Sequence, residues 1–272
     1  MPLVNLHTHS SYSDGTLSPA ELLKQALKSR ISYFSLTDHD TINGWNEIKE
    51  EIGRHKIRYD YGIELSTRNS DYLHILGYSI DPENAAFLSK LADYRERRVE
   101  RIKRIFLKLN ALGVKSGIEE MLLNDKTTFG RPHVAMLLKK KGYVRSIKEA
   151  FQKYISRGGP AYEPPMGPDV KEAIEDIKSC GGIAVLAHPG VVDKTVDFSE
   201  LKDYGLDGLE VFYPAHTASR TAEYLRTAEK YSFLVTAGSD FHGPGTERDK
   251  MFGFEYKPEY FSWMNDRFKG EL

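Results

Sequence analysis

The chain has 272 residues, enough for one large domain or one domain with a smaller insertion, and enough to bury a core without disulfides. Its 38 basic and 39 acidic residues give a formal net charge of -1, which excludes recruitment of nucleic acid by bulk positive charge. A single cysteine, Cys180, excludes an internal disulfide and a zinc site built from thiolates.

No stretch of the sequence is long and apolar enough to span a bilayer, and the first residues lack the pattern of a signal peptide. We therefore expect a globular, cytoplasmic protein that makes no membrane contact. No pattern in the sequence indicates an obligate protein partner.

Short runs of β-branched and aromatic residues alternate with helical patterns. A first helix is expected from Pro19 to Leu27, because Ser18 can cap it and Glu21 completes a capping box. The alternation predicts an α/β fold with a mainly parallel sheet, either a closed barrel or an open doubly wound sheet. The open dinucleotide-binding form lacks its glycine fingerprint after the first strand. The expected strands are Leu3–Leu6, Tyr33–Thr37, Arg58–Ile63, Tyr72–Tyr78, Ile183–Ala187, Gly208–Phe212 and Phe233–Ala237.

The alternation stops between about residues 81 and 179. Apolar positions at three- and four-residue steps predict a long amphipathic helix from Phe87 to Leu112, ended by Gly113. Shorter helices are expected at Glu119–Leu123, His133–Lys141 and Ile147–Ile155. We therefore expect a barrel in two parts, 1–82 and 180–272, interrupted by a helical insertion or lid at 83–179.

Histidine and carboxylate residues gather at the ends of the expected strands. His7 and His9 are two residues apart after the first strand, so their side chains leave the same face and can hold one ion. Similar residues follow or begin the other strands. The full set is His7, His9, Asp14, His39, Glu64, His74, His188, Asp240 and His242.

Nine such residues exceed the needs of one ion and predict a cluster of two or three divalent metals. Imidazole and carboxylate suit zinc, manganese or iron, and the number of carboxylates favours a harder ion such as manganese. Several metals together lower the pKa of a bound water and hold both oxygens of a displacement at phosphorus. The predicted reaction is hydrolysis of a phosphate ester.

The motifs that carry these residues, taken in order, resemble those of the PHP (polymerase and histidinol phosphatase) family. They are His7-Thr8-His9, Ser13-Asp14-Gly15, Thr37-Asp38-His39-Asp40, Gly62-Ile63-Glu64, His74, Ala187-His188-Pro189 and Gly238-Ser239-Asp240-Phe241-His242-Gly243. The inserted motif Phe129-Gly130-Arg131-Pro132-His133 resembles the stand-alone branch with 3′,5′-nucleoside bisphosphate phosphatases and a 5′-to-3′ exoribonuclease. The resemblance implies a distorted (β/α)7 barrel.

The resemblance also implies how three ions are shared. One is expected between His7, His9, Glu64 and Asp240, a second between Glu64, His74 and His188, and a third between Asp14, His39 and His242. The chain has Asn5 where the family usually has aspartate. An amide can orient a histidine but cannot supply the negative charge.

Candidate catalytic and substrate residues complete the prediction. A hydroxide that bridges the metals is expected to attack phosphorus, with His188, His133 or a metal-bound water as proton donor and Asp38 as a possible proton acceptor. Loss of Asp240 is expected to abolish turnover. Arg131 and His133 open a helix, where an anion is favoured, and Arg157 and His216 are further candidates for substrate contact.

The expected substrate is a small phosphorylated molecule, such as a nucleoside 3′,5′-bisphosphate. Three alternatives remain open at this point: a 5′-to-3′ exoribonuclease on short 5′-phosphorylated oligonucleotides, a hydrolase of cyclic phosphates or sugar phosphates, and a non-catalytic PHP module. A barrel alone does not select among substrates, because specificity comes from the site and its lid.

Overall fold

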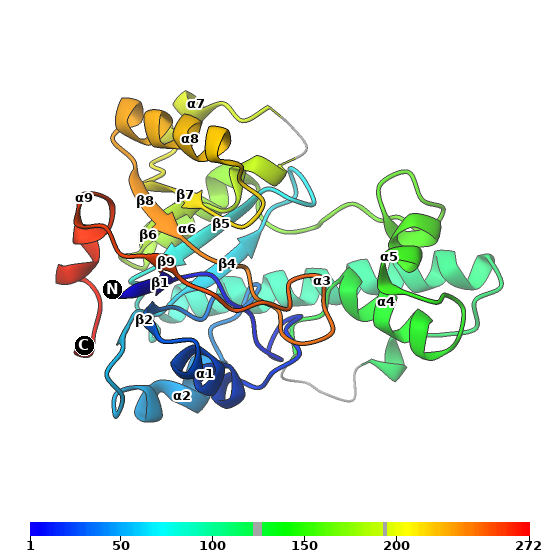
Figure 1. Ribbon diagram of the computed structural model, residues 1–272. Helices are drawn as coiled ribbons and strands as arrows, with labels where there is room; N and C mark the ends of the chain where they lie inside the picture. The colour runs from blue at the N-terminus through cyan, green and yellow to red at the C-terminus, as the bar shows by residue number, and fades with distance from the viewer. Residues whose placement is uncertain (122–126, 193–194) are drawn as a thin grey trace.

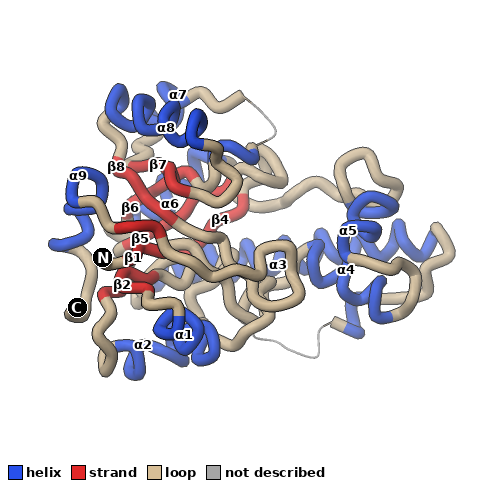
Figure 2. The backbone as a smooth tube through the Cα atoms, viewed as in Figure 1, coloured by secondary structure: helices blue, strands red, loops and turns tan. Residues whose placement is uncertain are grey.

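The computed structural model describes residues 1–121, 127–192 and 195–272. Its strands lie at the centre, with helices around them and a helical lobe to one side (Figures 1 and 2). They form two sheets with strand orders β3-β2-β1-β9 and β4-β5-β6-β7-β8. The strands are β1 Leu3–Asn5, β2 Ile31–Phe34, β3 Arg58–Tyr59, β4 Ile63–Ser66, β5 His74–Tyr78, β6 Ile183–Leu186, β7 Gly208–Phe212, β8 Leu234–Ala237 and β9 Phe254–Glu255.

Backbone contacts join the two sheets at both edges. On one side the amide of Leu6 donates to the carbonyl of Ala237 at 2.9 Å, and Thr8 forms a bridge with Phe241. On the other side His39 forms a bridge with Glu64. The sheets therefore curve into a distorted barrel, which confirms the expected α/β barrel class and positions the ends of β1, β2, β4 and β8 next to one another.

The expectation of a mainly parallel sheet needs correction at β5. This strand runs antiparallel to both β4 and β6, and β9 runs antiparallel to β1. The reason is the connection between β4 and β5: seven residues, 67–73, allow a reversal of direction but cannot hold a crossover helix.

The expected strand Arg58–Ile63 is two strands, because the chain leaves one sheet and enters the other between them. Gly62 lies at this crossing, where a Cβ atom would approach the Ser35 hydroxyl oxygen to 2.2 Å. Only glycine fits there without displacement of Ser35.

Most helices pack around the barrel. The first, α1 (Pro19–Lys28), begins as predicted with Ser18 as N-cap and a complete capping box with Glu21. Figure 1 shows α1 and α2 on one side of the strands and α7 and α8 on the opposite side. The others are α2 Trp45–Ile52, α6 Val170–Ser179, α7 Phe198–Asp203, α8 Ala218–Tyr231, α9 Pro258–Phe261, and the short turns Pro189–Val191 and Ser262–Asp266.

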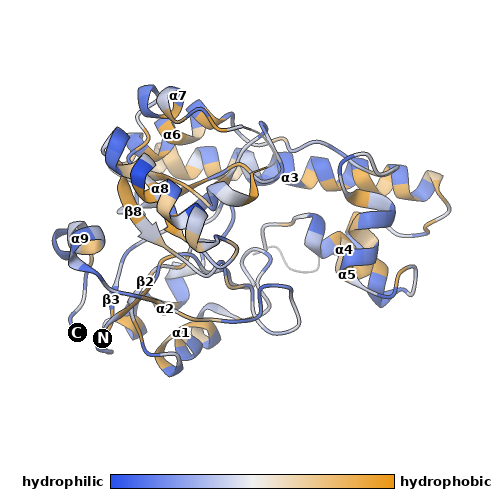
Figure 3. Cartoon of the chain, turned by 45° about the horizontal axis from the view of Figure 1, so that its top comes forward, coloured by the Kyte–Doolittle hydropathy of each residue, from blue (hydrophilic) through white to orange (hydrophobic). Residues whose placement is uncertain are grey.

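The long helix α3 (Ala85–Ala111) belongs to two separate apolar cores. Its first half contributes Phe87, Leu91 and Tyr94 to the barrel core, and its second half contributes residues such as Phe106 to the core of the lobe. Apolar and polar segments alternate along it in Figure 3. The lobe also contains the turn Ile118–Glu120, α4 Arg131–Lys140, α5 Ile147–Ala150 and the π-helical turn Phe151–Ile155.

The predicted insertion and this lobe do not have identical ends. Helix α6 falls inside the range 83–179, yet Ile174 and Ile177 belong to the barrel core. The domain division at residues 83 and 179 stays a prediction. The end of the expected helix Glu119–Leu123 lies outside the described residues. Within the described residues, no helix has the length and apolarity required to cross a membrane.

Candidate metal centre

The structure brings all nine predicted ligands into one connected cluster at a single end of the barrel. Each comes from the segment at one end of a strand, so the barrel itself positions them. The nine residues come from seven short, separate segments of the sequence, which the barrel brings together. The cluster contains three groups of donor atoms, each with all atoms within 4.8 Å of one another.

The first group is His7, His9, Glu64 and Asp240. The two Nε2 atoms of the histidines are 3.1 Å apart. Oε2 of Glu64 lies 3.2 Å from Nε2 of His7 and 3.1 Å from Nε2 of His9, and Oδ1 of Asp240 lies 3.3 Å from Nε2 of His9. Four donor atoms therefore point at one small volume.

The second group centres on Asp14. Its Oδ1 atom lies 3.2 Å from Nε2 of His242, and its Oδ2 atom lies 3.8 Å from Nε2 of His39. Nδ1 of His9 is 3.9 Å from Oδ1 of Asp14. His9 thus faces two groups at once, one with each ring nitrogen.

The third group is His39, Glu64 and His74, and His188 lies beside it, next to the other carboxylate oxygen of Glu64. Oε1 of Glu64 lies 2.8 Å from Nδ1 of His74 and 3.1 Å from Nε2 of His188. His39 also approaches this carboxylate, with its Nδ1 atom 3.2 Å from Oε2. Glu64 is therefore placed to bridge neighbouring ions.

Buried atoms without hydrogen bonds show that these residues fit metal ions. Among the described side chains, Oδ1 of Asp14, Oδ1 of Asp240 and Nδ1 of His188 are buried and make no hydrogen bond. A buried polar atom without a partner is costly, and most such atoms in proteins are satisfied. Two of the three belong to carboxylates that face imidazole nitrogens, which is a donor set that divalent metals satisfy.

The carboxylates change how the first two histidines hold protons. Burial alone would lower the pKa of His9, but its close contacts with Asp240 and Glu64 outweigh burial and raise the pKa to about 9. For His7, the charges of Glu210, Asp240 and Glu64 likewise outweigh burial and raise its pKa well above the ordinary value. A metal ion that binds here must displace these protons.

Glu210, on β7, supports the cluster from behind and was not predicted as a site residue. Its Oε1 atom accepts from Nδ1 of His7 at 3.0 Å, and its Oε2 atom accepts from the backbone amide of His188 at 2.7 Å. A carboxylate in this position fixes the ring and leaves the other nitrogen for a metal. Its place inside an apolar strand, Gly208–Phe212, was the available signal.

Asn5 does not orient a histidine ring. Its side-chain amide donates to the Ser239 hydroxyl at 2.7 Å and to the Phe252 carbonyl at 3.0 Å, while its oxygen accepts from the Ser239 amide at 3.0 Å. The residue is fully buried. The Asn5 side chain therefore connects β1 to the loop after β8. The negative charge next to the His7 ring comes from Glu210.

Asp38 lies beside the cluster but serves the turn that holds Asp14. Oδ1 accepts from the amide of Ser10 at 2.7 Å and from the hydroxyl of Ser13 at 2.6 Å, and Oδ2 accepts from the hydroxyl of Ser10 at 2.6 Å. Burial raises the pKa of Asp38 despite these hydrogen bonds. Its predicted role as a proton acceptor stays a prediction.

Arg98 on α3 connects the helix to the site and was also missed. Its guanidinium donates to the carboxylate of Asp40, to the Ser66 hydroxyl at 2.6 Å and to the Phe129 carbonyl at 3.4 Å. The Ser66 hydroxyl in turn lies 3.4 Å from Nδ1 of His39. The helix that carries the lobe is thus anchored one residue from a candidate ligand.

Arg131 takes part in a buried ion network at the start of α4. Its guanidinium lies 3.1 Å from Oδ1 of Asp71, and Arg101 lies 2.7 Å from the same oxygen. The Tyr162 hydroxyl donates to Oδ2 of Asp71 at 2.9 Å. Arginine outnumbers carboxylate in this network, so it carries net positive charge.

His133 and Arg157 lie on the lobe side. Nδ1 of His133 accepts from the amide of Gly130 at 3.0 Å, so Nε2 carries the proton of the neutral ring. Burial lowers the pKa of His133. Arg157 is exposed. The substrate roles of Arg131, His133 and Arg157 stay predictions.

His216 uses both ring nitrogens for the backbone. Nδ1 donates to the Val211 carbonyl at 2.8 Å, and Nε2 accepts from the amide of Gly190 at 3.1 Å. A Cβ atom on Gly190 would lie 2.6 Å from the ring. The ring therefore holds the loop after His188 in place, and the predicted contact of His216 with substrate stays a prediction.

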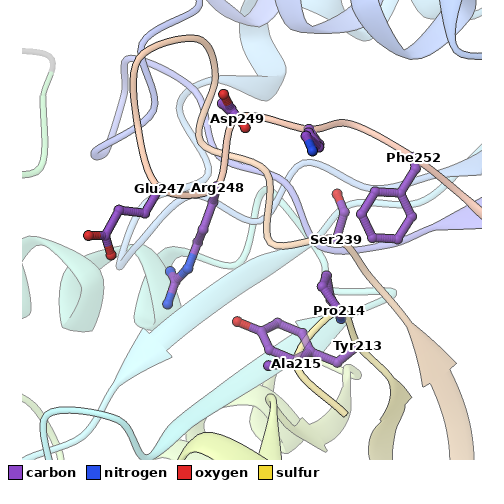
Figure 4. Close-up of a pocket in the computed structure, with 9 residues that line it drawn as sticks. Tyr213, Pro214, Ala215, Ser239, Glu247, Arg248, Asp249 and Phe252 are labelled. Carbon is purple, nitrogen blue, oxygen red and sulfur yellow. The ribbon is translucent and has the colours of Figure 1, made fainter. Parts of the chain in front are cut away.

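A cavity of about 430 Å³ lies close to Asp240, because two residues that line it, Tyr213 and Arg248, contact this carboxylate. Nη1 of Arg248 lies 2.9 Å from Oδ2 of Asp240, and the Tyr213 hydroxyl donates to the same oxygen at 3.0 Å. Figure 4 shows the Arg248 side chain extended from its loop toward the Tyr213 hydroxyl. The two oxygens of Asp240 therefore face different spaces: Oδ1 the donor cluster and Oδ2 the edge of this cavity.

Three residues at the cluster have a left-handed backbone. They are Asp40, His188 and Asp240, with φ angles of 50°, 31° and 53°. Each follows the end of a strand. The conformation turns the chain sharply at that point, which keeps the neighbouring side chains at the barrel end.

Comparison with known proteins gives consistent matches over almost the whole chain. The family model described as the PHP domain matches residues 5–271. A 3′,5′-nucleoside bisphosphate phosphatase from Chromobacterium violaceum is 31% identical over 253 residues, which cover 90% of this chain and 89% of that protein. The 5′-3′ exoribonuclease Rnm from Salmonella typhimurium is 31% identical over 251 residues, with 89% of this chain and 86% of that protein covered.

A solved structure has the same fold. An amidohydrolase from Chromobacterium violaceum, with bound sulfate and no metal, superposes with a TM-score of 0.87 at 29% sequence identity. The match covers 98% of this chain and 97% of that one. The lobe is therefore part of the shared architecture.

Proposed function

This chain belongs to the PHP domain family and is a hydrolase of phosphate esters, and we propose that its substrate is a small nucleotide that carries a phosphomonoester, such as a nucleoside 3′,5′-bisphosphate. The observation that carries the proposal is the largely buried cluster of nine imidazole and carboxylate residues, eight of them in three donor groups and the ninth, His188, 3.1 Å from Glu64. The similarity to the bisphosphate phosphatase supports the choice of substrate.

We assign the metal ligands by donor group. His7, His9, Glu64 and Asp240 would hold one ion; Glu64, His74 and His188 a second; Asp14, His39 and His242 a third. The mixed nitrogen and oxygen set favours manganese, with iron or zinc as alternatives. Divalent ions at these positions supply the charge that attracts a phosphate and acidifies a bound water.

The residues around the cluster position the reacting groups. Glu210 holds the ring of His7, and Arg248 together with Tyr213 holds Oδ2 of Asp240. His133 is the proposed proton donor to the leaving oxygen, because its Nε2 atom carries the proton and the residue is outside the three donor groups. Asp38 keeps the Ser10–Ser13 turn in place.

The second candidate is a 5′-to-3′ exoribonuclease on short 5′-phosphorylated RNA, supported by the similarly close exoribonuclease relative. Both substrates present a terminal phosphate next to a phosphate ester. A hydrolase of cyclic phosphates or sugar phosphates is the remaining alternative.

Product analysis by mass spectrometry separates these functions. Manganese-loaded protein is incubated with adenosine 3′,5′-bisphosphate and, separately, with a short 5′-phosphorylated RNA. We expect orthophosphate and 5′-AMP from the first substrate. Stepwise release of 5′-mononucleotides from the RNA would favour the exoribonuclease, and the absence of product from both would favour a cyclic or sugar phosphate.

Two variants control this experiment. Asp240→Asn should lower kcat by at least about 10³-fold with the fold retained, because it removes a charged ligand while asparagine tolerates the left-handed backbone. Asp203→Asn, at the exposed end of α7, should keep full activity. Full activity of Asp240→Asn with a verified metal content would contradict the mechanism.

A further inference from the structure

The cavity close to Asp240 is large enough for an organic ligand and not only for a phosphate. Its volume of about 430 Å³ lies within the range of ligand pockets in proteins, roughly 300–1,000 Å³. Phosphate and metals would occupy the donor cluster on the other side of Asp240. The cavity is thus next to the reacting groups and separate from them.

Apolar and aromatic side chains line two facing sides of the cavity. Phe252 is 38% exposed, and Pro214 and Ala215 line the opposite side together with the ring of Tyr213. Figure 4 shows the Phe252 ring beside Ser239, across the cavity from Tyr213 and Pro214. A large aromatic ring left partly open to water offers a surface on which a flat ring can stack.

The loop from Glu247 to Lys250 lines the cavity with charges of both signs, and Arg248 is the charged side chain that contacts Asp240. Nη1 of Arg248 binds Oδ2 of Asp240, and 40% of the Arg248 side chain is exposed. A guanidinium has five donors in one plane, so an arginine that pairs with Asp240 through one nitrogen keeps an edge for a phosphate oxygen. Lys250 lines the same cavity.

The loop that forms this wall is held in place from inside the barrel. Asn5 binds the Phe252 carbonyl and the Ser239 hydroxyl, and the amide of His242 donates to the Arg248 carbonyl at 2.9 Å. The loop between Arg248 and Phe252 is therefore attached at both ends to residues of the barrel end. The backbone positions of Arg248 and Phe252 are therefore fixed at the two ends of this loop.

We propose that this cavity is a nucleoside subsite, in which the base stacks on Phe252 and Arg248 contacts the phosphate that the nucleoside carries toward the metal cluster. The inference rests on the proposed function, which places the phosphate ester at the metal cluster. It adds the residues that select a nucleotide over a sugar phosphate. A sugar phosphate would satisfy Arg248 but would leave the aromatic wall without a partner.

The test measures binding in the metal-free protein, so that it does not depend on turnover. Saturation-transfer NMR with 3′-AMP, which carries the phosphate that is expected to face the metal cluster, should show its strongest saturation transfer at the base protons, and Phe252→Ala should reduce that transfer at least threefold. Ribose 5-phosphate, which lacks the base, should bind equally weakly to wild type and Phe252→Ala. Leu107→Ala, at an exposed apolar position on α3, is the matched control and should change nothing.

A second arm isolates Arg248. Wild type should prefer 3′-AMP over adenosine, and Arg248→Gln should remove that preference while base contact of adenosine persists; circular dichroism verifies the fold. The proposal is overturned if saturation transfer to the base protons is absent in the wild type or is unchanged in Phe252→Ala. Binding that depends on Phe252 in a protein that fails to hydrolyse the bisphosphate retains the subsite and refutes the proposed function.

Discussion

The carboxylate of Glu210 accepts the Nδ1 proton of His7 at 3.0 Å across 203 residues of sequence. This contact leaves Nε2 of His7 directed at His9, Glu64 and Asp240. It also links the two parts of the barrel, because His7 lies in the first part and Glu210 in the second. The other oxygen of Glu210 accepts from the amide of His188. One buried side chain thus orients donors that belong to two different groups.

Replacement of this carboxylate should weaken metal binding without loss of the fold. Glu210→Gln keeps the size of the side chain but removes the charge that fixes the His7 ring. We expect a loss of about 10- to 100-fold in affinity for Mn²⁺, measured by calorimetric titration. Glu229→Gln, exposed near the end of α8, should bind as the wild type does. Equal affinity in both variants would show that Glu210 does not orient a ligand.

A change toward the usual aspartate at position 5 should destabilise this protein. Asn5→Asp removes both amide donors and places a buried carboxylate against the Phe252 carbonyl. We expect a loss of about 1–3 kcal/mol in the free energy of unfolding, measured by urea denaturation. Asn43→Asp, at an exposed position, should change it by less than about 0.5 kcal/mol. A stabilised Asn5→Asp protein would contradict the hydrogen-bond assignment.

Stability of the metal-free protein should decrease as pH rises from 6.5 to 9. Folded His9 keeps its proton up to about pH 9, whereas the unfolded chain releases it near 6.5. The bound proton therefore stabilises the fold fully below pH 6.5, and this contribution is lost on the way to pH 9. Tm measurements across this range should show the decline.

Metal should reverse that trend, because metal binds the deprotonated rings. The increase in Tm caused by Mn²⁺ should grow from pH 6.5 to 9. His9→Gln should show a smaller decline of the metal-free Tm than the wild type. A metal-free Tm that is independent of pH in the wild type would exclude a proton shared between His9 and its carboxylates.

Removal of the charge at Asp71 should strongly destabilise the lobe. Asp71→Asn leaves Arg101 and Arg131 close together without a counter-charge in a buried environment. We expect a cost of about 3–5 kcal/mol, measured by urea denaturation. Asp169→Asn removes a partly exposed partner of Arg68 and should cost less than about 1 kcal/mol. Similar values for the two variants would mean that the Asp71 network contributes little.

The sequence predicted the cluster of nine ligands because each one follows or begins a strand, and parallel strands of a barrel bring such positions to one end. Glu210, Arg98 and Arg248 could not be found in this way. Glu210 and Arg98 act through contacts with residues far away in the chain, and Arg248 acts through Asp240, eight residues before it. A single charged residue in a strand, a helix or a loop has no spacing that marks such a contact.

The same limit applies to the fold. The alternation of strands and helices correctly indicated the α/β class, and the family resemblance implied the barrel. The reversed direction of β5 depends on the short connection 67–73, which periodicity does not describe. Likewise, the apolar pattern of α3 predicted one long helix and could not show that its two halves belong to different cores.

At Asp40, His188 and Asp240 the left-handed backbone limits which amino acids can occupy the position. At His188 and Asp240 the residue must also offer a donor atom to a metal. Aspartate, asparagine and histidine are the side-chain-bearing residues that accept this conformation most readily. Two of these three, aspartate and histidine, are also common metal ligands. A glutamate or cysteine at position 188 or 240 would offer a donor atom but would meet a conformational penalty before any ion arrived. Mutational routes to a different metal preference are therefore constrained by the backbone at these positions as much as by coordination chemistry.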